Sequence, residues 1–291
     1  MHESSLKYLR CVKCHKALEL EIIRKKEEIN EGFLVCKRCS LRNPIISKIP
    51  IIWENLALYL SKRIQLGGYL YSHSTSREMR SFIKSSLSKT KKDIDDISWV
   101  EKKWVLIYLA SRKARFYSII KNILQKLPKS KLSLEHGCSV GFVSEILAKQ
   151  NELVFGIDSS YFTIAQAKKS FKQNLDYFVA DSLCHPFGNQ KFDLVVGLNL
   201  LELIEPKELI KVISSQIKNG MVVLSDPFDF ERGKNSVKNP LYEKTLRDEL
   251  RKYGFAISSQ TRKPSHISWN LNINKRSRLN YKVDLIIGKK S

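Results

Sequence analysis

Residues 132–141 constrain the fold of this 291-residue chain more than any other stretch. They read as a short apolar strand, then a turn with Gly137, Ser139 and Gly141 at every second position, then a helix running to about residue 150. Glycine suits positions where the backbone takes positive φ or approaches a ligand closely, and the helix N-terminus behind the turn offers free N–H groups. The stretch predicts a ligand-binding strand–turn–helix unit, although such a turn alone also occurs where nothing binds.

The remainder of the second half alternates strands with helices, the pattern of a parallel sheet with crossover helices. The predicted strands are residues 132–135, 153–157, 177–180, 192–197 and 221–224, and the predicted helices are residues 140–150, 160–171 and 206–217. A helix over 241–253 leads to a strand over 255–260 and a last strand over 281–287. Because no helix separates these last two strands, the final strand is expected to be antiparallel.

Four of the six cysteines form two Cys-x-x-Cys pairs near the N-terminus, Cys11 with Cys14 and Cys36 with Cys39. Four thiolates at this spacing can close a tetrahedral structural zinc site. The residues between the pairs read as a β-hairpin, and residues 43–53 read as one extended closing strand. A segment this small cannot build a sufficient core alone, so metal is expected to supply much of its folding free energy.

Helical patterns fill the region between the cysteines and residue 130. Asn55 is expected to cap a helix that Gly67 and Gly68 end, residues 76–87 form a second helix, and residues 98–127 form one long amphipathic helix. The basic and aromatic side chains of this region either face a substrate or form ordinary core and solvated surface.

The net charge of +22 is unevenly distributed. Residues 131–230 carry nine Lys and Arg against twelve Asp and Glu, whereas every flanking region is strongly basic. This pattern is typical of proteins that bind a polyanion such as RNA, or of a lysine-rich surface that is simply solvated. The chain lacks a secretory signal and any apolar run of about 20 residues, which predicts a cytoplasmic protein without a membrane partner.

The second half resembles class I S-adenosylmethionine-dependent methyltransferases. Residues 135–141 resemble the acidic-x-Gly-x-Gly-x-Gly loop of the family, with Ser139 in place of the middle glycine. Residues 156–158 and 179–182 each end a predicted strand with an acidic side chain, and residues 192–199 resemble the fourth strand of the family and the turn beyond it.

The resemblance implies a Rossmann-like sheet, mostly parallel with an antiparallel last strand, and S-adenosylmethionine as the cofactor. Asp158 would accept both ribose hydroxyls, and Asp181 with Ser182 would hold the adenine. The loop would lie against the methionine part of the cofactor. The implied cofactor-binding residues are Glu135, Gly137, Ser139, Gly141, Asp158, Ser159, Asp181, Ser182 and Asn199.

The whole chain also resembles methyltransferases that carry an N-terminal zinc ribbon, among them enzymes that modify guanines of large-subunit ribosomal RNA. The predicted organisation is a zinc ribbon over 1–56, a helical, substrate-side segment over 57–130 and a class I methyltransferase domain over 131–291. RNA is the acceptor placed first, and a small metabolite or a protein side chain is the alternative. A third possibility is a non-catalytic protein that uses a degenerate methyltransferase fold to bind RNA or a partner.

Two segments are candidate walls of the acceptor site. Asp226 and Asp229 follow the fifth predicted strand, where they would orient an amine or act as a base, or would merely cap a turn. Residues 264–278 join the last two predicted strands and combine an aromatic platform with amide and cationic groups suited to RNA. The candidate RNA-contacting side chains there are Trp269, Asn270, Lys275, Arg276 and Arg278.

Overall fold

The structure is a computed structural model that describes residues 1–91, 94–231, 233 and 236–291. The chain forms two compact units. The first contains residues 1–106, 139–141 and 157–188, and the second contains residues 107–138, 142–156 and 189–291. Among the described residues, no helix has the length and apolar character that crossing a membrane requires.

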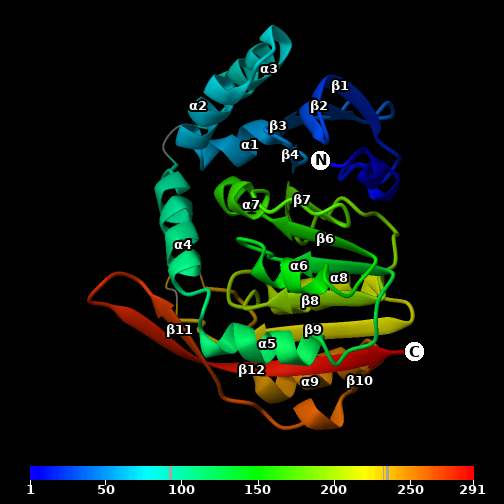
Figure 1. The fold of residues 1–291 in the computed structure, drawn as a ribbon, viewed down its shortest axis with the longest axis vertical. Helices are drawn as coiled ribbons and strands as arrows, with labels where there is room; N and C mark the ends of the chain where they lie inside the picture. Colours follow the sequence, from blue (N-terminus) through cyan, green and yellow to red (C-terminus); the bar gives the residue numbers. More distant parts are fainter. Residues whose placement is uncertain (92–93, 232, 234–235) are drawn as a thin grey trace. The chain divides into compact units, whose positions relative to one another are not determined.

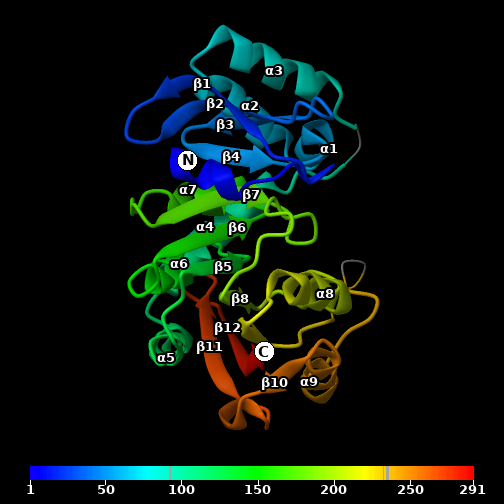
Figure 2. The same ribbon diagram turned by 90° about the vertical axis from the view of Figure 1, so that its right-hand side faces the viewer.

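The first unit begins with a short 3-10 helix, η1 (Glu3–Tyr8), and an antiparallel sheet, which Figure 2 shows in blue. Its strands are β1 (Glu19–Lys25), β2 (Ile29–Val35), β3 (Arg42–Ile46) and β4 (Ile49–Ile52). The β1–β2 pairing confirms the predicted hairpin. The prediction of a single closing strand over 43–53 is wrong. Ser47 and Lys48 take positive φ of 52° and 70° and turn the chain back between two strands.

Strand β4 connects the cysteine-bearing sheet to a strand from the second half of the sequence. It pairs in parallel with β7 (Leu175–Ala180), with Ile51 opposite Val179 and Ile52 opposite Ala180. The order within the first unit is therefore β1-β2-β3-β4-β7. The helix that precedes β7 in the chain is α7 (Tyr161–Ala167).

Strand β4 is followed in the first unit by the helices α1 (Leu56–Ser61), α2 (Ile64–His73) and α3 (Arg77–Ser88). Asn55 and Ser76 cap α1 and α3 through their side chains, as predicted for Asn55. The prediction that Gly67 and Gly68 end a helix is wrong, because both lie inside α2. A Cβ on Gly67 would lie 2.3 Å from Leu87 Cδ2, so this glycine permits close packing of α2 on α3.

The long helix predicted over 98–127 is interrupted at residues 111–114 and forms α4 (Ser98–Ala110) and α5 (Arg115–Leu124). The interruption contains neither glycine nor proline. Ser111 instead accepts a hydrogen bond from the backbone of Asn272 at 2.9 Å, and α5 buries Phe116, Ile120 and Leu124. Tertiary contacts therefore replace the local signal that usually ends a helix.

The second unit holds the α/β sheet in the order β5-β8-β9-β12-β10. Strands β5 (Leu132–His136), β8 (Leu194–Leu198) and β9 (Gly220–Asp226) are parallel, and β12 (Arg278–Lys290) runs antiparallel beside β9 and β10 (Phe255–Ile257). Figure 1 shows β8, β9 and β12 side by side. This arrangement confirms the α/β fold, the mostly parallel sheet and its antiparallel last strand.

Helices α6 (Phe142–Leu147), α8 (Pro206–Gln216) and α9 (Glu243–Lys252) complete the second unit, with the short η3 (Ser259–Thr261). Strand β6 (Leu153–Asp158) contributes its first four residues to this unit and its last two to the first. Strand β11 (Ile267–Asn272) lies in a segment predicted only as a connection, and it pairs antiparallel with β12.

Candidate functional site

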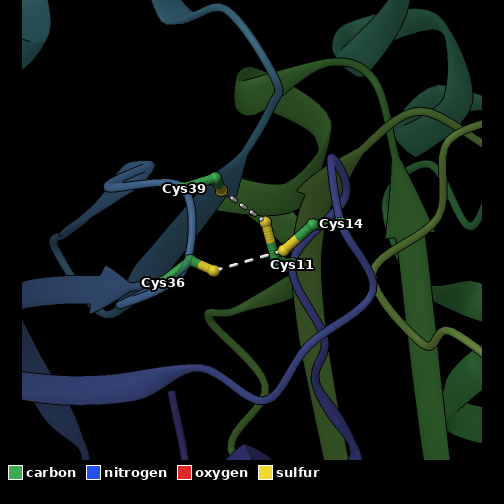
Figure 3. A group of neighbouring side chains, drawn as sticks. All are labelled: Cys11, Cys14, Cys36 and Cys39. Atoms are coloured by element: carbon green, nitrogen blue, oxygen red, sulfur yellow. Dashed lines mark hydrogen bonds between the residues drawn. The ribbon is translucent and has the colours of Figure 1, made fainter.

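The four N-terminal cysteines converge on one point, as Figure 3 shows. The sulfur atoms of Cys11 and Cys39 lie 3.4 Å apart, as do those of Cys14 and Cys36, and all four lie within 4.8 Å of one another. A tetrahedral zinc ion with Zn–S bonds of about 2.3 Å would place its sulfurs roughly 3.8 Å apart. No disulfide joins these cysteines, so the donor set and spacing fit a structural zinc ion.

The two cysteine-bearing loops have the same backbone design. His15 donates its amide to the carbonyl of Cys11, and Ser40 donates to that of Cys36, both at 2.8 Å. His15 and Ser40 take positive φ of 57° and 56°, which turns each loop after its second cysteine. The side chain of His15 is exposed and outside the sulfur cluster, which leaves four cysteines as the candidate ligands.

In the first unit, the end of the glycine loop meets the end of β6. The backbone amide of Ser139 donates to Asp158 Oδ2 at 2.9 Å. A Cβ on Gly141, which has φ of 82°, would lie 2.4 Å from the hydroxyl of Tyr177, so only glycine fits there. Ser139, which stands where the family loop has its middle glycine, has φ of 48°, in the left-handed region that glycine adopts most easily.

Asp158 is held by three donors. Its Oδ1 accepts from the amide of Ser160 at 2.8 Å and from the hydroxyl of Thr163 at 3.1 Å, in addition to the bond from Ser139. An ionised carboxylate offers about four lone-pair sites. Roughly one site therefore remains for a ribose hydroxyl, fewer than the two-hydroxyl contact predicted from the sequence.

A buried ion pair from the helical segment affects the electrostatics of Asp158. Arg63 Nε and Nη2 lie 2.9 and 2.8 Å from Glu101 Oε1, and the guanidinium lies over the ring of Tyr59 at 4.3 Å. Burial raises the pKa of Asp158, while its hydrogen-bond donors and the charge of Arg63 oppose that rise. Sequence reasoning missed Arg63 and Glu101 because neither belongs to a motif and both are remote from Asp158 in the chain.

The other first-unit candidates lie at the turns after β6 and β7. Ser159 is exposed, and its carbonyl accepts a hydrogen bond from Tyr59 at 2.9 Å. Asp181 is half-buried, and its Oδ1 accepts from the amide of Leu183 at 2.8 Å. Ser182 is buried. Asp181 thus caps its turn and retains its second oxygen for other donors.

In the second unit, the beginning of the glycine loop is packed and polar. Glu135 is 3% exposed and accepts a hydrogen bond from the hydroxyl of Ser144. Gly137 has φ of 64°, and a Cβ there would lie 2.4 Å from Leu200 Cδ2. Asn199, with φ of 57°, accepts from the hydroxyl of Ser225 at 2.9 Å. Glu135 and Asn199 are therefore each oriented by a side-chain hydrogen bond, and Gly137 allows Leu200 to pack against the loop.

Asp226 and Asp229 differ in their surroundings. Asp226 is fully buried, and its two oxygens accept from the amides of Leu201 and Phe228, both at 2.8 Å. These contacts match the turn-capping alternative. Asp229 is half-buried and accepts from the hydroxyl of Tyr281 at 3.1 Å, so the two carboxylates do not share one environment. The predicted acceptor-site wall that carries these two carboxylates spans residues 225–233, and residue 232 within it lies outside the described residues.

Within the units, the structure brings together Ser139 with Asp158 and Asn199 with Ser225. The predicted cofactor site draws on both units, since Glu135 and Asn199 belong to the second and Asp158 to the first. Its complete assembly stays a prediction.

Comparison with known proteins identifies the central part of the chain. Residues 134–219 match the family model described as a methyltransferase domain. Over 96 residues the chain is 35% identical to ubiquinone biosynthesis O-methyltransferase from Coxiella burnetii. That alignment covers 32% of this chain. The chain spans 41% of the length of the curated relatives that it matches.

Two solved structures share the fold at low sequence identity. Magnesium protoporphyrin IX methyltransferase from Synechocystis PCC 6803 with bound SAH has a TM-score of 0.50 and 18% identity, covering 67% of this chain and 95% of that one. The second structure is a complex between the Haloferax volcanii Trm112 methyltransferase activator and the putative methyltransferase. It has a TM-score of 0.52 and 14% identity, and the match covers 65% of this chain and 96% of that one. These similarities show that the chain shares the fold of these two methyltransferase structures.

Proposed function

We propose that this chain, whose residues 134–219 belong to the methyltransferase-domain family, transfers a methyl group from S-adenosylmethionine to an acceptor. The observation that carries the proposal is the hydrogen bond from the amide of Ser139 to Asp158. It fixes the end of the glycine loop against the carboxylate that ends β6, at the carboxyl edge where open α/β sheets bind ligands.

Each part of the cofactor has a proposed protein partner. Asp158 accepts from the ribose, and the backbone from Gly137 to Gly141, with Glu135, receives the methionine part. Asp181, Ser182 and Ser159 lie at the turns proposed for the adenine and ribose, and Asn199 is proposed to lie near the transferring methyl group. The cofactor supplies an electrophilic methyl group on a sulfonium, and the protein aligns the acceptor for in-line displacement.

Calorimetric titration of the zinc-loaded protein with S-adenosylmethionine tests this assignment. We expect saturable binding in the native protein and roughly 10- to 100-fold weaker binding in Asp158→Asn, because a hydrogen bond to a charged group contributes about 1.5–3 kcal/mol. Asp248→Asn, an exposed change on α9, is the matched control and should bind as the native protein does. Absence of binding by the native protein would leave only the non-catalytic alternative.

A structural zinc ion held by Cys11, Cys14, Cys36 and Cys39 is the second part of the proposal. With four thiolates no coordination position is open for catalysis, so the metal is proposed to stabilise the fold. Metal analysis of the native protein should give about one zinc per chain, and Cys36→Ser should lower that ratio. A full zinc content in Cys36→Ser would contradict this ligand set.

RNA is the acceptor proposed first, because the regions flanking the mildly acidic centre are strongly basic. A hydroxyl of a small molecule is the second candidate, and the relationship to an O-methyltransferase of ubiquinone biosynthesis favours it. The proposed base or orienting groups are Asp229 and, if its capping bonds open, Asp226. Transfer of a radiolabelled methyl group into cell extract, separated into RNA, protein and small molecules, distinguishes the acceptors.

A protein partner is a further possibility. The Haloferax volcanii neighbour was solved as a complex with the Trm112 methyltransferase activator. Methyl transfer by the purified chain alone, compared with transfer in extract, would show whether an additional protein is needed.

A further inference from the structure

The segment predicted to join the last two strands is a two-faced hairpin of β11 and β12, which Figure 1 shows beside α5. The register places Trp269 opposite Tyr281 and Leu271 opposite Leu279. The ring centroid of Trp269 lies 5.5 Å from the ring centroid of Phe116 on α5 and 5.6 Å from that of Tyr281. Trp269 is 5% exposed, so its predicted role as a stacking platform for bases is wrong, and it anchors the hairpin instead.

The opposite face of the hairpin is polar and cationic. We call the exposed residues of this face together with the adjoining turn the basic hairpin face: Asn270, Arg278, Asn280 and Lys282 lie on the strands, and Lys275 and Arg276 lie in the turn that joins them. From Arg262 to Val283 the sequence contains six Lys and Arg and no Asp or Glu. Among the described residues, no ion pair engages Lys275, Arg276 or Lys282, so their charges are available to an external anion.

Both ends of the hairpin are fixed by buried polar contacts. Arg247 lies 2.6 and 3.1 Å from the two oxygens of Asp284, and it also donates to the carbonyls of Thr261 and Lys263. The amide of Ser265 donates to Asp284 at 2.7 Å. These bonds hold the residues before β11 against β12, so the basic hairpin face has a rigid base and a small ordering entropy to lose on binding.

A second group of cations lies next to the hairpin. Asn272, at the end of β11, donates its amide to Ser111 at 2.9 Å. The residues that follow Ser111 are the exposed Arg112 and Lys113, and Arg115 begins α5. Arg112 lies 3.3 Å from Glu145, so the positive surface extends from the hairpin to this turn mainly through Lys113 and Arg115.

We propose that the basic hairpin face docks a single-stranded segment of RNA. Its cations match phosphates, and the amides of Asn270 and Asn280 can both donate to and accept from the edges of unpaired bases. The face presents no large apolar side chain, since the partly exposed Leu279 points to the opposite face by register, and this disfavours insertion into a membrane. The proposal rests on the proposed function only in treating the docked RNA as the methyl acceptor.

The test compares two triple variants with equal loss of charge, using a fluorescein-labelled 20-nucleotide RNA of mixed sequence without stable pairing. Lys275→Gln/Arg276→Gln/Lys282→Gln should raise the Kd about tenfold or more and lower the slope of log Kd against log salt by about 2, since each single-strand phosphate contact contributes about 0.7. The control is Lys207→Gln/Lys211→Gln/Lys218→Gln, which changes three exposed lysines in and after α8 of the same unit. It should bind the RNA nearly as tightly as the native protein does.

Equal binding by the hairpin variant and the native protein would overturn the proposal, as would an equal loss in the α8 control. Binding to phosphatidylglycerol vesicles that exceeds RNA binding and disappears in the hairpin variant would assign the face to a membrane instead. Thermal unfolding and S-adenosylmethionine titration of each variant should be unchanged, which shows that fold and cofactor site are intact. Failure of the native protein to bind S-adenosylmethionine refutes the proposed function but leaves the RNA measurement valid.

Discussion

Ser139 takes a backbone conformation that glycine adopts more easily. Its φ of 48° is in the left-handed region, which costs non-glycine residues about 1–2 kcal/mol. The amide of Ser139 nevertheless reaches Asp158, so the conformation positions the donor. The loop therefore holds this donor against Asp158 at some expense in stability.

We expect Ser139→Gly to raise the free energy of unfolding by up to about 1 kcal/mol, because relief of the left-handed strain exceeds the added entropy of the unfolded chain. S-adenosylmethionine binding should be retained. Ser139→Val, which is β-branched, should lower both stability and binding. Urea unfolding and calorimetry of the three proteins check this, and a less stable glycine variant would show that the hydroxyl itself contributes.

His136, at the end of β5, should make stability depend on pH. Burial lowers its pKa to about 4, with a partial compensation from Gln216 at 2.8 Å. In the unfolded chain the pKa is about 6.5, so the unfolded state binds more protons between these values and stability falls as pH decreases from about 6.5 to 4. The loss of unfolding free energy should be at most about 3.5 kcal/mol, since a shift of one pKa unit corresponds to about 1.4 kcal/mol. Urea unfolding of His136→Asn should show a smaller loss across this window than the native protein does.

Elements far apart in the sequence are joined by a buried charge cluster. Lys168, at the end of α7, lies 2.8 Å from Asp176 on β7 and also contacts Glu28 in the β1–β2 turn. Its side chain is 8% exposed. Burial alone would raise the pKa of Asp176, but Lys168 reverses the shift and holds it at about 2.

Lys168→Met should reduce the free energy of unfolding by about 3–5 kcal/mol, because it leaves two buried carboxylates without their shared cation. Asp176 stabilises the native protein above the unfolded pKa of about 3.9, and this contribution is lost as pH falls toward 2. In the variant the loss should begin at higher pH. Lys169→Met, an exposed neighbour, should change stability by less than about 0.5 kcal/mol in the same urea titrations. A small effect at Lys168 would mean that other cations near Glu28, such as Lys48 at 3.3 Å, replace its charge.

Local patterns predicted the elements that depend on local signals. Apolar runs located β5, β6, β7, β8 and β9, and the side-chain cap of α1 was read from Asn55. The break between α4 and α5 was missed because it depends on contact between Ser111 and Asn272. Strand β11 was not predicted, although Ile267, Trp269 and Leu271 alternate with polar residues, because two of those polar residues are asparagines, which strands disfavour.

The candidate site was predicted to a similar extent. Asp158 and the glycine loop were identified because the motif is contiguous, and the four cysteines because of their spacing. The charged residues around Asp158 were not identified from the sequence, because Arg63 and Glu101 come near it only through the packing of α2 and α4. The three-part domain division stays a prediction, and the grouping of residues 1–106 with 157–188 shows how extensively the N-terminal region contacts β7.

At the scale of the whole molecule, zinc should affect more than the cysteine loops. Chelation followed by hydrogen–deuterium exchange should show faster exchange in β1 to β4 and also in β7, because β4 shares backbone hydrogen bonds with β7. Strands β9 and β12 should retain their protection, and added zinc should restore the native pattern. Unchanged exchange in β4 and β7 after metal removal would mean that the fold does not depend on the ion.

The pairing of Ile51 and Ile52 with β7 has a consequence for any shortened form of the protein. A protein that lacks residues 1–55 would lose β4. Strand β7 would then have backbone amides and carbonyls without partners along one edge. Such an open edge recruits other chains, so the truncated protein should self-associate. In the full chain, β4 covers this edge of β7.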